Sequence, residues 1–175
     1  INLSRVFSVT QFYHFSFMIV SLALLGFGAS GTFLAIFPRI GRGNPSLSLG
    51  VLSLGNATSI LGAYVLVNKV PFDSFSMAWD QKQIGIFALH YFVLALPFFF
   101  SGAAVGLLLD IYHESAGKVY ATNLIGSSMG CLGALAASYI IGGEGTMVLS
   151  SGVAALAGIV ALVPLVGRSL ETKAV

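Results

Sequence analysis

The side chains best suited to chemistry are two histidines in separate apolar stretches. If both stretches are transmembrane helices, His14 and His90 lie within two turns of the same membrane face. Two neutral imidazoles on facing helices can ligate the iron of a b-type haem. Tyr13 and Tyr91 lie beside them, and an interfacial belt of aromatic residues explains the same pattern. A hydrogen bond to a neighbouring helix is the more ordinary role of such an imidazole, so we favour it over haem ligation.

A glycine pattern in the first apolar stretch has two interpretations. Gly26, Gly28 and Gly31 spell G-x-G-x-x-G, which in a soluble chain indicates dinucleotide binding. That function requires the motif between a strand and a helix, and here it lies inside an uninterrupted apolar stretch. Small residues in membrane helices let neighbouring backbones approach closely. The sequence therefore favours helix packing over nucleotide binding.

A few polar side chains interrupt the apolar stretches, where they are costly and so mark candidate sites. These intramembrane candidates are Asn56, His90, Tyr120 and Asn123. We expect them to form interhelical hydrogen bonds, which are common in membrane bundles. A solute pathway beside Asn56 and Pro97 is the alternative, because transporters bind substrates at broken helices near mid-membrane. The absence of paired acidic residues deep in these stretches argues against proton-coupled transport.

No catalytic constellation is present in the sequence. It contains no Ser-His-Asp set, no Cys-x-x-Cys pair, no zinc-ligand spacing and no phosphate-binding loop. The single cysteine, Cys131, lies in an apolar stretch and cannot form an internal disulfide. We therefore expect no catalytic residue, metal site or cofactor within this chain.

Composition identifies the environment that these residues require. Hydrophobic residues make up 57% of the chain and charged residues 8%, with a mean hydropathy of +0.94. Soluble domains carry about 25% charged residues. An exterior this apolar is suited to hydrocarbon, so the lipid bilayer is the expected partner. The net charge of +2, without a basic patch, argues against nucleic-acid binding.

The apolar stretches are long enough to cross a bilayer, which takes about 20 residues each. Clusters of proline, glycine and charged residues separate them, at Pro38–Pro45, Lys69–Gln83, Asp110–Lys118 and Gly142–Gly145. The sequence thus predicts an all-α integral membrane bundle of about five transmembrane helices. Their approximate ranges are 12–37, 47–67, 84–109, 119–141 and 146–166.

Glycines on the apolar stretches predict how these helices pack, because small residues allow close approach. The expected packing positions are Gly26, Gly31, Gly102, Gly106, Gly126, Gly130 and Gly133. We expect the glycine faces of the third and fourth spans to hold those two helices together as an antiparallel hairpin. Pro97 should kink the third span, because it lacks a backbone N–H and clashes with the preceding turn.

The positive residues of the short loops predict orientation. One face would receive Arg39, Arg42, Lys118, Arg168 and Lys173, and the other Arg5, Lys69 and Lys82. Because cytoplasmic loops carry the excess of Lys and Arg, the first face and the C-terminus are expected in the cytoplasm. Ile1 and Val175 have the character of cut ends, so we expect a longer parent chain.

Two long segments together resemble a known family. They are SRVFSVTQFYHFSFMIVSLALLGFGASGTFL, from Ser4 to Leu34, and the segment from Leu96 to Gly145. The second contains Tyr120, Ala121, Asn123, Leu124 and Gly126, in a Tyr-Ala-x-Asn/Asp-Leu-x-Gly pattern. The pair resembles the membrane region of spermidine synthase-like proteins, in which a helical bundle precedes an aminopropyltransferase-type domain.

The resemblance implies a function outside this chain. The family's catalytic residues belong to the soluble domain, which would follow the last span, so none maps onto this sequence. The expected function is to anchor that cytoplasmic domain in a bacterial inner membrane, or to supply its substrate. The alternatives are a bundle that transports a small solute, for example a polyamine, and a haem-binding membrane subunit. The expected partners are the bilayer, the missing domain of the same chain and other copies in a homo-oligomer.

Overall fold

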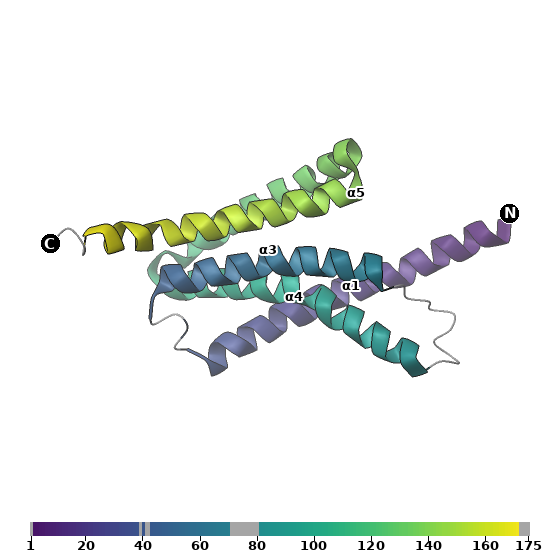
Figure 1. The fold of residues 1–175 in the computed structure, drawn as a ribbon, viewed down its shortest axis with the longest axis horizontal. Helices are drawn as coiled ribbons and strands as arrows, with labels where there is room; N and C mark the ends of the chain where they lie inside the picture. Colours follow the sequence, from purple (N-terminus) through teal and green to yellow (C-terminus); the bar gives the residue numbers. More distant parts are fainter. Residues whose placement is uncertain (1, 39, 41–42, 71–80, 172–175) are drawn as a thin grey trace.

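The computed structural model describes residues 2–38, 40, 43–70 and 81–171, and the side chains of 19–38, 40, 43–70 and 82–164 within them. All regular structure in these described residues is helical. In chain order the elements are α1 (Asn2–Ile36), α3 (Pro45–Lys69), α4 (Gln81–Ile111), the short 3-10 helix η2 (His113–Ser115) and α5 (Ala116–Glu171) (Figure 1). The predicted all-α class is therefore confirmed.

The described chain has 4 helices that are long and apolar enough to cross a membrane, whereas five were predicted. These segments are Ile19–Ile36, Pro45–Lys69, Lys82–Ile111 and His113–Pro164. The difference arises in the last one, because the predicted spans 119–141 and 146–166 both lie within α5. The 52 residues of His113–Pro164 would measure about 78 Å as a straight helix, against a hydrocarbon core of about 30 Å.

A reversal at Gly142 explains how α5 accommodates this length. Gly142 is the one residue of α5 given non-helical dihedrals, with φ 74° and ψ 177°. The Ser138 and Thr146 hydroxyl oxygens lie 3.3 Å apart across it. Residues eight apart in a straight helix are about 12 Å apart along the axis. The chain therefore folds back at Gly142, and the return of α5 alongside α3 is visible in Figure 1.

Proline chemistry defines the boundary between α1 and α3. Pro38 has no backbone N–H and cannot extend α1, whose last turn closes with a 2.9 Å hydrogen bond from the Phe37 N–H to the Phe33 carbonyl. Pro45 begins α3, where its fixed φ suits the first helical turn. The Ser48 hydroxyl donates a 2.6 Å hydrogen bond to the Ile40 carbonyl, which ties the connection to α3.

The helices pack in the order α1, α4, α3, α5. α4 contacts both α1 and α3, and α3 also contacts α5, whereas α4 and α5 meet over a smaller area. The core between α3 and α4 is formed by Leu52, Ala103 and Leu107. Pro97 lies inside α4, which changes direction along its length as the missing N–H and the ring clash of proline require (Figure 1).

The crossing of α1 and α4 depends on glycine. A Cβ added at Gly26 would lie 2.6 Å from Phe98 Cβ and 2.9 Å from both the Ala95 carbonyl oxygen and the Phe99 nitrogen. From the α4 side, a Cβ at Gly102 would lie 2.5 Å from Ser30 Oγ. Only residues without side chains permit so close an approach. The two helices therefore meet backbone to backbone beside Pro97.

The packing of α3 and α5 follows the same principle. A Cβ at Gly50 would lie 2.5 Å from Leu162 Cγ, and one at Gly158 would lie 3.2 Å from the Gly50 carbonyl oxygen. The buried Ser151 hydroxyl donates a 3.0 Å hydrogen bond to the Ala57 carbonyl of α3. Ser151 contacts Ala57, and Leu162, further along α5, contacts Gly50, which is earlier in α3. The return segment of α5 therefore runs antiparallel to α3.

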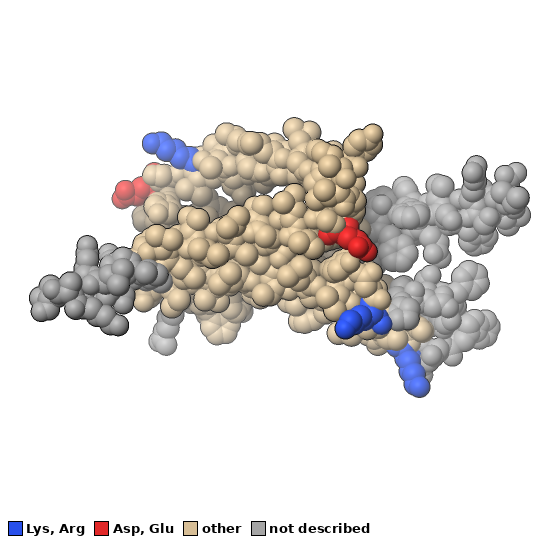
Figure 2. Space-filling view, turned by 45° about the horizontal axis from the view of Figure 1, so that its top comes forward, with Lys and Arg blue, Asp and Glu red and all other residues tan. Residues whose placement is uncertain are grey.

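The surface that the structure describes has the character of a membrane protein. Its charged side chains all lie at helix ends or beside the α5 reversal. They are Lys69, Lys82, Asp110, Glu114, Lys118 and Glu144. Figure 2 shows charged side chains at opposite ends of the visible face, with uncharged surface between. Large apolar side chains are exposed in the uncharged region, such as Met129 (69%) and Tyr139 (93%). These helices are compatible with a lipid bilayer and suggest a membrane location.

Candidate functional site

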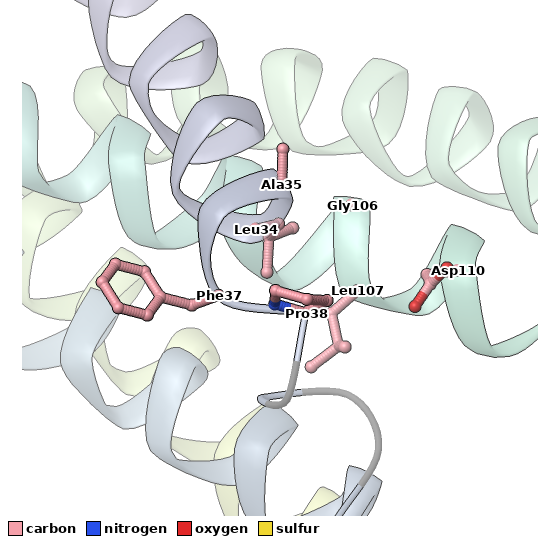
Figure 3. Close-up of a pocket in the computed structure, with 7 residues that line it drawn as sticks. All are labelled: Leu34, Ala35, Phe37, Pro38, Gly106, Leu107 and Asp110. Atoms are coloured by element: carbon pink, nitrogen blue, oxygen red, sulfur yellow. The ribbon is translucent and has the colours of Figure 1, made fainter.

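The candidate site is a pocket between the C-terminal ends of α1 and α4. It has a volume of about 330 Å³, near the lower limit of about 300 Å³ for ligand pockets. The residues that line it are Leu34, Ala35, Phe37, Pro38, Gly106, Leu107 and Asp110. Figure 3 shows Leu34 and Pro38 from the end of α1 on one side and Asp110 from α4 on the other.

Asp110 supplies the only polar side chain among these lining residues. It is exposed, one residue before the end of α4. No described residue forms an ion pair with its carboxylate. Its main-chain carbonyl lies 3.3 Å from His113 Nδ1, so the contact of that imidazole is with the backbone rather than with the carboxylate. The described lining of the pocket therefore carries one negative charge.

The end of α1 adds hydrogen-bond acceptors to the pocket region. The Leu34 carbonyl would normally accept from the N–H four residues later, but that residue is Pro38, which has none. The last turn of a helix also carries the negative end of the helix dipole. Among the described residues that line the pocket, the polar groups are thus acceptors: a carboxylate and main-chain carbonyls.

The predicted polar candidates do not meet in this pocket. Asn56 is half-buried on α3, and its carbonyl accepts a 2.8 Å hydrogen bond from the Ser59 hydroxyl. Tyr120 is exposed and Asn123 half-buried, both on the first part of α5. His90 Nδ1 lies 2.9 Å from the Ile86 carbonyl of its own helix. The side chain of His14 lies outside the described residues, so the haem interpretation stays a prediction.

The predicted packing glycines behave differently from one another. Gly26, Gly102 and Gly106 lie at the α1–α4 contact, where a Cβ at Gly106 would lie 2.8 Å from Leu34 Cδ1. No atom of the described structure lies within 4 Å of a Cβ built at the other four, Gly31, Gly126, Gly130 and Gly133. The expected glycine-mediated hairpin between the third and fourth spans is therefore wrong. Gly102 and Gly106 pack on α1 instead, because α1 occupies that face of α4.

Two features of the site region escaped the sequence interpretation. Gly50 and Gly158 were not singled out, although both are buried at the α3–α5 contact. The sequence analysis places Asp110 only at the start of the break Asp110–Lys118. The position of Asp110 could have indicated a site, because a lone carboxylate directly after an apolar span has no helical neighbour of opposite charge to pair with.

The reversal of α5 is held near the end of α3. The Glu144 carboxylate lies close enough to the Tyr64 hydroxyl to interact with it electrostatically. Tyr64 lies toward the Lys69 end of α3, whereas the pocket lies toward the Pro45 end. The pocket and the reversal are thus at opposite ends of the bundle.

Comparison of the chain with family models, curated proteins and solved structures gives no match. The resemblance to spermidine synthase-like membrane regions therefore depends on the residue pattern alone. Among the described residues, no three or more His, Cys, Asp or Glu side chains lie close enough together to hold a metal ion.

Proposed function

We propose that this helical domain crosses the membrane five times and anchors a cytoplasmic aminopropyltransferase-like domain that follows it in a longer chain. The observation that supports the anchoring part is the separation of charge. The described charged side chains lie at the two ends of the bundle, and the surface between them is apolar. This arrangement is what a bilayer requires of helices that cross it.

The path of α5 supports the proposal of five crossings. Asp110 and Pro38 lie together at one end of the bundle, and Glu144 lies beside Tyr64 toward the other. After the reversal, Leu162 of α5 returns to Gly50, near the start of α3. α5 therefore passes along the bundle twice, and each pass has spanning length.

The anchoring role is tested through the segment that follows Val175 in the parent chain. The expected result is a nucleotide-binding domain whose full-length form, in membranes, transfers an aminopropyl group from decarboxylated S-adenosylmethionine to a diamine. Residues 1–175 alone should be inactive, because they contain no catalytic constellation. A parent chain without such a domain, or transfer by the fragment itself, contradicts the proposal.

Orientation is tested separately by cysteine labelling. The chain has a single cysteine, so Cys131→Ser gives a background free of thiols. In that background Ser115→Cys, in η2, should be labelled by an impermeant maleimide only after the cells are opened. Asn68→Cys is the matched control. It lies near the C-terminal end of α3, at the opposite end of the bundle from η2, and should react from outside. The reverse pattern would place the C-terminus outside and contradict a cytoplasmic enzyme domain.

A further inference from the structure

We draw no further inference here: the strongest candidate, the face of small residues that Gly126, Gly130 and Gly133 form on the first part of α5, has no described atom within 4 Å of a Cβ built at any of the three, and nothing in the structure shows what covers it.

Discussion

Replacing Gly26 by alanine is expected to destabilise the bundle by about 1–3 kcal/mol, the usual cost of overpacking a close contact. The new methyl group would lie 2.6 Å from Phe98 Cβ and 2.9 Å from two backbone atoms of α4. Backbone atoms cannot rotate away as the end of a flexible side chain can. α1 and α4 must therefore separate, and the contact beside Pro97 is lost. The measurement is the free energy of unfolding in mixed micelles, followed by far-UV circular dichroism.

The same helix provides the control for this substitution. Gly28 lies two residues away, and no atom of the described residues lies within 4 Å of a Cβ built there. Gly28→Ala should leave the free energy of unfolding unchanged or raise it slightly, since alanine has the higher helix propensity. If both variants lose stability equally, the loss would reflect a general requirement for glycine in α1 rather than the contact with α4.

Replacing Gly142 by alanine is expected to disrupt the reversal of α5. With φ 74° and ψ 177°, Gly142 occupies a region of backbone conformation that is essentially restricted to glycine. A Cβ there costs on the order of 1–3 kcal/mol. The helices on both sides would be favoured to continue through the site, which would separate the residues that the reversal brings together.

A disulfide between the two sides of the reversal measures this effect directly. The Ser138 and Thr146 hydroxyl oxygens lie 3.3 Å apart, so cysteines at both positions, in the Cys131→Ser background, should form an intramolecular disulfide on mild oxidation. Gly142→Ala should reduce the extent of crosslinking. Gly143→Ala is the matched control, because its backbone is helical and its Cβ position is open. Efficient crosslinking in both variants would show that Gly142 is not required for the turn.

The sequence alone determined the features that depend on local chemistry. Apolar stretches with internally satisfied backbone hydrogen bonds must be helices in a bilayer, so the all-α class follows from composition and length. The breaks at Pro38 and Pro45 follow from the missing N–H and the fixed φ of proline. The cluster from Gly142 to Gly145 indicated a tight turn, and the structure places the reversal at Gly142.

Only the tertiary structure decided which residues meet. Gly26 and Gly28 are indistinguishable as sequence, yet one touches the α4 backbone and the other faces open space. Two residues along a helix are rotated by about 200°, so the direction from which α4 approaches selects between them. The same reason explains why Gly102 packs on α1, whereas no described residue packs on Gly126. The pocket forms only because the ends of α1 and α4 lie side by side. Pro38 and Asp110 are 72 residues apart in the chain, so no local sequence pattern indicates that they line the same pocket.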